Sequence, residues 1–163
     1  MKKNKIIYIH IGPHKTGTTT IQHALLKNEV TLFENGILSP KTGRSFPISA
    51  ANHNLAWELI GKSDKRFDPK IGTWEDLVHE MKLKDEYKKV ILSSESFSSL
   101  AKNQIDKIRK ILEGYQVFII IYLRRQDEVL QSTWVQHIRR GRNPVIDSFD
   151  DWLQKNNYLE PHT

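Results

Sequence analysis

Nine residues near the N-terminus combine the groups that bind anions in proteins. The segment from Gly12 to Thr20 has the sequence GPHKTGTTT. Its glycines allow tight curvature, its threonines supply hydroxyl donors, and Lys15 adds a full positive charge. An apolar run precedes it and a helical pattern follows, so its N–H groups would converge at a helix N-terminus, where an anion is stabilised. The segment predicts a phosphate-type loop; the alternative is an ordinary glycine-rich turn with a threonine cap.

This loop departs from the ATP-binding pattern G-x-x-x-x-G-K-[ST]. Thr18 stands where that pattern has its lysine, and Lys15 lies two residues before Gly17. The departure disfavours a kinase that uses ATP with Mg²⁺, as does the lack of an evident metal-binding aspartate at a strand end. The seven histidines form no H-E-x-x-H or similar close ligand cluster, so we expect no metal site.

A second pair of candidate anion ligands follows the strongest apolar run. Arg124 comes directly after Leu123, and Ser132 stands eight residues further on, within a helical pattern. A guanidinium is a natural bidentate partner for phosphate, and a hydroxyl two helical turns along can converge on the same anion if the strand end faces that helix. Each residue taken singly also has a simpler interpretation. Arg124 would be a solvated or salt-bridged surface arginine, and Ser132 a serine on a helix surface.

A strand followed by P-x-K-T-G-T-T, with a later strand that ends in arginine and a serine eight positions on, resembles the sulfotransferases that use 3′-phosphoadenosine 5′-phosphosulfate (PAPS). The similarity covers Ile6 to about Arg140. It implies transfer of a sulfuryl group from PAPS to a hydroxyl or amine of a carbohydrate, lipid or other acceptor, which releases adenosine 3′,5′-diphosphate. A nucleotide or anionic-glycan binder without turnover remains the alternative.

The resemblance also implies roles for individual residues. Arg124 and Ser132 would bind the 3′-phosphate, and Lys15 would stabilise the leaving oxygen. The 5′-phosphosulfate would be cradled by Lys15, Thr16, Gly17, Thr18, Thr19 and Thr20.

Sulfuryl transfer needs a group that takes the proton of the attacking hydroxyl. Glu95 follows an expected strand, at the place where several carbohydrate-modifying relatives carry a catalytic glutamate; the alternative is that it caps or salt-bridges a neighbouring helix. His14 is the second candidate, either as the base or as a cofactor or acceptor contact. His53 could line the acceptor cleft, although a polar helix-start residue is favoured. His10, inside a strand, is predicted to be a satisfied core histidine.

The elements that must position these residues alternate along the chain. Runs of β-branched and apolar residues predict strands over residues 5–11, 89–93 and 116–123, and a short extended piece over 36–38. Helical spacing predicts helices over residues 18–34, 52–60, 74–86, 102–112, 127–139 and 148–157. The alternation predicts an α/β fold with a central parallel sheet, and the resemblance implies the three-layer sandwich of sulfotransferases and P-loop NTPases. The motifs fall at the carboxyl ends of the strands, where such folds bind ligands.

Composition limits the classes of protein that remain. The 163 residues include 25 Lys+Arg and 19 Asp+Glu, a net charge of +6 that favours anionic partners, although we expect no nucleic acid. The absence of cysteine excludes a disulfide scaffold, a thiolate zinc site and a cysteine nucleophile. The four tryptophans lie in helical patterns and are predicted to pack rather than to form a stacking platform.

Length and hydropathy set the expected organisation. We expect a single domain over residues 1–163; measured against the resembled family, it would be a fragment, a truncated form or a compact variant that lacks a C-terminal part. The longest apolar run has seven residues, far fewer than the ~20 that a membrane-spanning helix needs. The N-terminus lacks the pattern of a signal peptide, so we expect a cytoplasmic protein.

Overall fold

The computed structural model describes residues 5–45, 49–61, 65–84, 86–139 and 148–156. The chain divides into two compact units, Met1–Leu123 and Arg124–Thr163. Each unit is described by itself, and the single domain expected over residues 1–163 stays a prediction.

A parallel sheet forms the centre of the first unit. Within the described residues its strands are β1 (Ile6–His10), β2 (Ile37–Leu38), β3 (Lys89–Ser93) and β4 (Gln116–Ile120), in the order β2-β3-β1-β4. All of the pairings are parallel, and the register places His10 opposite Ser93 on one side and Ile120 on the other. The predicted α/β class with a central parallel sheet is therefore confirmed, and the carboxyl ends of three strands lie level at one edge.

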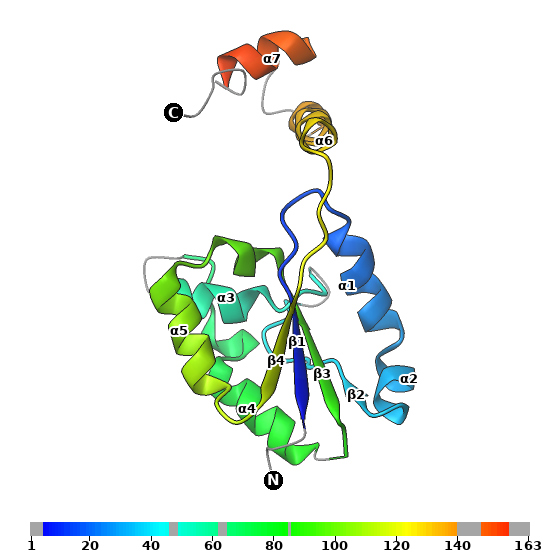
Figure 1. Ribbon diagram of the computed structural model, residues 1–163, viewed down its shortest axis with the longest axis vertical. Coiled ribbons are helices and arrows are strands. Elements are labelled where there is room, and N and C mark those ends of the chain that lie inside the picture. The colour runs from blue at the N-terminus through cyan, green and yellow to red at the C-terminus, as the bar shows by residue number, and fades with distance from the viewer. Residues whose placement is uncertain (1–4, 46–48, 62–64, 85, 140–147, 157–163) are drawn as a thin grey trace. The chain divides into compact units, whose positions relative to one another are not determined.

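Helices cover both faces of this sheet. They are α1 (Thr18–Lys27), α2 (Glu29–Glu34), α3 (His53–Ile60), α4 (Trp74–Leu83) and α5 (Lys102–Ile111), with the short 3₁₀ helices η1 (Pro69–Ile71) and η2 (Glu95–Ser99). Figure 1 shows α1 and α2 on one side of the sheet and α3, α4 and α5 on the other. In the described ranges, no helix is both long and apolar enough to cross a membrane.

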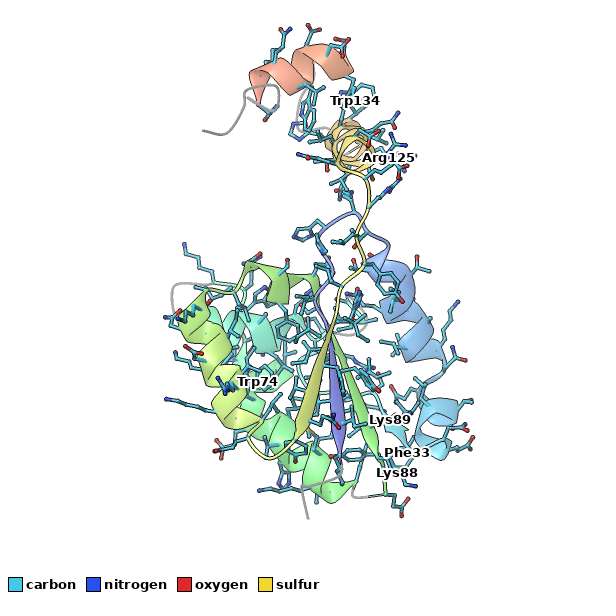
Figure 2. The ribbon with its side chains drawn as sticks, in the orientation of Figure 1. Phe33, Trp74, Lys88, Lys89, Arg125 and Trp134 are labelled. Atoms are coloured by element: carbon cyan, nitrogen blue, oxygen red, sulfur yellow. The ribbon has the colours of Figure 1, made fainter. Side chains whose placement is uncertain are left out.

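The core lies between the sheet and the α3–α4 side. Alternate residues of β1 and β3 point into it, as the period of a strand requires. Trp74 is buried there, its indole N–H donates to the carbonyl of Leu55 at 2.8 Å, and its packing role is as predicted (Figure 2). The buried side chains around it include Ile7, Ile9, Leu38, Leu55, Leu59, Leu77, Met81, Val90, Leu92, Phe97 and Leu112. Each aliphatic side chain buried in this way contributes about 1.5–3 kcal/mol.

Two predicted helices are interrupted or shortened. The helix expected over residues 18–34 is two helices, α1 and α2, which meet at Asn28. The backbone of Asn28 is non-helical, with φ −105° and ψ 16°, and the side-chain amide of Asn28 donates to the carbonyl of Ala24 at 2.8 Å. Asparagine competes with the helix in this way because its short amide can bond a nearby carbonyl. The helix expected over residues 74–86 ends earlier, at Leu83.

The strand expected over residues 116–123 also ends early, at Ile120. Its partner in the described sheet is β1, which ends at His10, opposite Ile120. The last backbone bond between them runs from the N–H of Ile11 to the carbonyl of Ile120 at 2.9 Å. Continuous apolar runs are typical of strands buried on both faces. Here the run forms an edge strand in which Val117, Phe118 and Ile119 are exposed.

The described residues of the second unit form two helices that make aromatic contacts with each other. These are α6 (Gln126–Arg139) and α7 (Phe149–Lys155), and they confirm the helices expected over residues 127–139 and 148–157, of which residue 157 lies outside the described part. The ring of Phe149 lies 5.6 Å from that of Trp134 and 6.2 Å from that of Trp152. Both tryptophans therefore have packing roles, as expected.

Candidate functional site

The chain leaves the adjacent strands β1 and β3 in opposite directions. From β1 it runs to α1 on one side of the sheet, and from β3 it runs through η2 to α5 on the other side (Figure 1). Ligands bind in the crevice that forms at such a switch point, outside the carboxyl ends of the strands. The predicted anion loop follows β1 and Glu95 follows β3, so the topology places both at the carboxyl ends of adjacent strands. Lys88 and Lys89 lie at the opposite end of the sheet (Figure 2).

The loop between β1 and α1 has a tightly curved backbone. Lys15 has φ 71° and Gly17 has φ 84°, both in the left-handed region that favours glycine. The Thr16 hydroxyl donates to the carbonyl of Pro13 at 2.8 Å and closes the turn. A lysine in this conformation is strained, and such strain concentrates at functional sites.

The N-terminus of α1 has no side-chain cap. The residue that precedes the helix is Gly17, and in the described structure no side chain hydrogen-bonds to that helix end. The threonine cap of the alternative interpretation is therefore not formed, because Thr18 is already the first helical residue. The first N–H groups of an α-helix have no partner within it, so this end is suited to an anion.

Gly12 lies where the loop passes closest to its own side chains. A Cβ atom at Gly12 would lie 2.7 Å from Thr18 Cγ2, and 3.1 Å from both His10 Nε2 and Thr16 Oγ1. Glycine is required there by close packing. Thr18 is buried, whereas Thr19 and Thr20 are exposed. The loop thus offers its backbone and the outward hydroxyls of α1 to a ligand, while Thr18 supports it from below.

Glu95 connects η2 to the loop and to α1. Its Oε2 accepts a hydrogen bond from Gln22 Nε2 at 3.0 Å, and its Oε1 lies 3.7 Å from Nδ1 of His14. The structure therefore brings together Glu95 and His14, the two candidate bases. The alternative interpretation is that Glu95 caps or salt-bridges a neighbouring helix. Glu95 does contact the neighbouring helix α1, but through the neutral amide of Gln22 rather than through a salt bridge.

The charge of Glu95 is set by competing effects. Burial alone would raise its pKa, but the hydrogen bond from Gln22 and the electrostatic effect of His53 and His14 outweigh burial and lower the pKa below the ordinary value of 4.5. The carboxylate is therefore ionised at neutral pH and remains 18% exposed, within reach of a ligand.

His53 is near enough to the same carboxylate to interact with it electrostatically. Its Nδ1 is 2.7 Å from the Ser94 hydroxyl, and its ring stacks on Trp57 at 5.4 Å between centroids. Arg66 lies over the same indole, at 5.1 Å. Burial lowers the pKa of His53 below 6.5, against the opposing effect of Glu95, so the imidazole is neutral at pH 7. His53 starts a helix, as favoured from the sequence, and it also belongs to the electrostatic environment of Glu95.

Asn52 explains why His53 reaches this position. Its backbone N–H donates to the carbonyl of Ser93 at 2.8 Å, and its side-chain oxygen accepts from the Ser93 N–H at 3.1 Å. Its side-chain amide donates to the carbonyl of Thr42 at 2.8 Å. These bonds fix the start of α3 to the end of β3. The signal in the sequence is a histidine between two asparagines, Asn52 and Asn54, which carries no local link to Glu95.

His10 is buried beneath the loop. It is 2% exposed, as expected of a core histidine, and its Nδ1 lies 2.8 Å from the Ser93 hydroxyl. The expectation that it is fully satisfied is wrong: among the described residues, nothing hydrogen-bonds to its buried Nε2. Burial lowers its pKa below 6.5, against the opposing effect of Glu95.

The predicted ligands of the 3′-phosphate belong to the second unit. Arg124 Nε donates to Oε2 of Glu128 at 2.8 Å, and both side chains are more than 40% exposed. This is the salt bridge that the plain alternative describes. Ser132 is half-buried on α6. Because the two units are described separately, the role of both residues stays a prediction.

Comparison with known proteins found no relative for this chain. No family model, no curated protein and no solved structure matches it. Across the ranges that the structure describes, no group of three or more histidine or acidic side chains could hold a metal ion.

Proposed function

We propose that this protein transfers a sulfuryl group from PAPS to a hydroxyl or amine of an acceptor. One observation carries the proposal. A glycine-containing loop that bears Lys15 opens into an uncapped helix N-terminus at the switch point of a parallel sheet, and the ionised Glu95 lies 3.7 Å from its His14. An anion-binding loop beside a proton acceptor is the pairing that sulfuryl transfer requires.

The residues of the loop fit a phosphosulfate group. Gly12 lets the backbone pass without a side chain, since a Cβ there would clash with Thr18. The N–H groups at the start of α1 and the charge of Lys15 favour an anion. Lys15, Thr16, Gly17, Thr18, Thr19 and Thr20 would hold the phosphosulfate. Bound PAPS supplies an activated sulfuryl group on a phosphate leaving group.

The electron and proton transfers can be assigned to this chain's residues. The acceptor oxygen forms a bond to sulfur as the bond from sulfur to the bridging phosphate oxygen breaks. The electron pair of that bond leaves with the phosphate, and Lys15 offsets the growing negative charge. The acceptor proton goes to a neighbouring base.

Glu95, His14 and His53 are the candidates for the role of base. Glu95 is the predicted base, with His14 beside it, but its lowered pKa makes it a weak proton acceptor. His53 is neutral at pH 7, the form that can accept a proton, and is the alternative base. Loss of activity as the pH falls from about 6.5 to 4.5 would indicate a histidine, because the Glu95 carboxylate stays ionised over that range.

Turnover of labelled PAPS tests the proposal. The protein is incubated with PAPS and a panel of sugar, lipid and small hydroxyl acceptors, and release of adenosine 3′,5′-diphosphate is followed. We expect transfer by the wild type and a large loss in Lys15→Ala and Glu95→Gln. Lys89→Ala is the matched control, since its exposed side chain lies at the other end of the sheet.

Two results would contradict the proposal. Binding of the nucleotide without transfer to any acceptor would indicate a non-catalytic binder. Phosphoryl transfer from Mg-ATP would indicate a kinase instead.

A further inference from the structure

His10 is a buried histidine with one nitrogen engaged and the other unpartnered. Its Nδ1 lies 2.8 Å from the Ser93 hydroxyl, and its ring meets the ring of Tyr122 edge-on at 5.6 Å. In the described structure nothing hydrogen-bonds to Nε2, which is buried. A buried polar atom without a partner costs free energy, so its retention needs an explanation.

The unpartnered nitrogen faces the anion loop. The position that a Cβ atom would take on Gly12 lies 3.1 Å from His10 Nε2 and 3.1 Å from Thr16 Oγ1. The Thr16 hydroxyl in turn donates to the carbonyl of Pro13. The imidazole therefore supports the loop from below, at its first glycine.

The charged groups around His10 allow its imidazole ring to take up a proton. Without a ligand, burial keeps the ring neutral at pH 7, while the ionised Glu95 of η2 favours the charged form. Of the other elements at this edge, β3 contributes the uncharged Ser93, the loop contributes His14 and Lys15, and α3 contributes His53. A bound anion at the loop would add negative charge on the side that Nε2 faces. Protonation would then turn Nε2 into a donor and stabilise the occupied loop.

We propose that His10 is a positioning residue of the anion loop, which takes up a proton when an anion binds and so makes occupancy of the loop dependent on pH. The inference rests on anion binding at the loop, which is part of the proposed function, and not on sulfuryl transfer itself.

The sign of the effect follows from linkage. The pKa of His10 lies below 6.5 without ligand and rises when the anion is bound. Affinity for the anion therefore increases as the pH falls from the His10 pKa of the bound state to that of the free state, by at most about tenfold per pH unit for one proton. Above the pKa of the bound state, affinity no longer depends on His10.

The experiment measures protons taken up on binding. Adenosine 3′,5′-diphosphate is titrated into the full chain by calorimetry at about pH 6.5, in two buffers with different ionisation enthalpies. We expect the wild type to take up more protons than His10→Asn, whose amide can still bond Ser93; the nucleotide phosphates, with a second pKa of about 6, contribute equally to both. His79→Gln is the matched control, because His79 is an exposed histidine on α4. An NMR titration of the His10 ring in the wild type, with and without the nucleotide, gives the same answer without a variant.

Each outcome is decisive. Proton uptake that is smaller in His10→Asn than in the wild type and unchanged in His79→Gln supports the inference, as does a raised pKa of the His10 ring with the nucleotide. Equal proton uptake by the wild type and His10→Asn overturns it and leaves the anion site intact. Absence of binding removes the proposed function together with the inference.

Discussion

At the scale of single residues, the site depends on charge states that neighbours set. Glu95 is ionised because an amide and two histidines outweigh its burial, and His53 is neutral because burial outweighs Glu95. An ionised carboxylate and a neutral imidazole side by side suit proton transfer at neutral pH. Such perturbed groups in a crevice are typical of functional sites.

Lys15 and Arg124 should affect different steps if their predicted roles are correct. Lys15→Ala should lower kcat by roughly 10²–10³-fold with only a moderate loss of affinity, because most of the charge it stabilises develops in the transition state. Arg124→Ala should instead weaken binding of adenosine 3′,5′-diphosphate by about 1.5–3 kcal/mol, the range for a hydrogen bond to a charged group. Steady-state kinetics and nucleotide titrations measure both. Equal effects of the two variants on both parameters would contradict the assignment.

Glu95 should also make stability depend on pH. Its pKa in the folded state lies below 4.5, so the stability that its charge contributes is present above that value and lost as the pH falls through the folded pKa. Urea unfolding should therefore show a larger difference between the wild type and Glu95→Gln at pH 7 than at about pH 3.

Glu58 is the matched comparison for this effect. Burial raises the pKa of Glu58, although the hydrogen bond from the backbone N–H of Trp74 opposes this shift. Lowering the pH should therefore stabilise the folded wild type relative to Glu58→Gln, which is the opposite trend to that of Glu95. The same pH trend in both variants would count against the account of Glu95.

At the scale of elements, the loop between β1 and α1 determines the site. Gly12→Ala forces a Cβ within 2.7 Å of Thr18 Cγ2, so the loop must move away from α1 and nucleotide affinity should fall by at least about tenfold. Gly17→Ala meets no atom within 4 Å but retains a φ of +84°, so it should cost about 1 kcal/mol of stability with a smaller loss of affinity. Calorimetry and urea unfolding of both variants measure the two effects. A greater loss of affinity in Gly17→Ala would show that steric room at Gly12 is not what the loop needs.

Local sequence patterns predicted most of the elements. The strand from Lys89 to Ser93 was predicted to the residue, because it is buried and flanked by polar residues. The end of β4 at Ile120 depends on where β1 ends, and no pattern inside the run reveals it. The break at Asn28 depends on a bond that the side chain forms with its own helix.

The site was predictable only in part, for the same reason. Glycine, lysine and threonine spacing identified the loop, and position after a strand identified Glu95. The contacts that define their chemistry join residues far apart in sequence, Gln22 to Glu95 across 73 positions and His53 to Ser94 across 41. Tertiary pairing of this kind leaves no local signal.

At the scale of the whole molecule, strand order and charge act together. The order β2-β3-β1-β4 places the loop and Glu95 directly after adjacent central strands, so their proximity is a consequence of topology rather than of any single residue. The net charge of +6 adds a field that attracts anions over longer distances. Anionic nucleotides are therefore the class of ligand that both features favour.

Calorimetric titration with adenosine 3′,5′-diphosphate tests the central claim most directly, with adenosine 5′-monophosphate and Mg-ATP as competitors and Lys15→Ala and Lys89→Ala as paired variants. We predict tight binding that requires the 3′-phosphate, falls in Lys15→Ala and is unchanged in Lys89→Ala. Preference for Mg-ATP, or equal binding of the nucleotide without a 3′-phosphate, would contradict the claim.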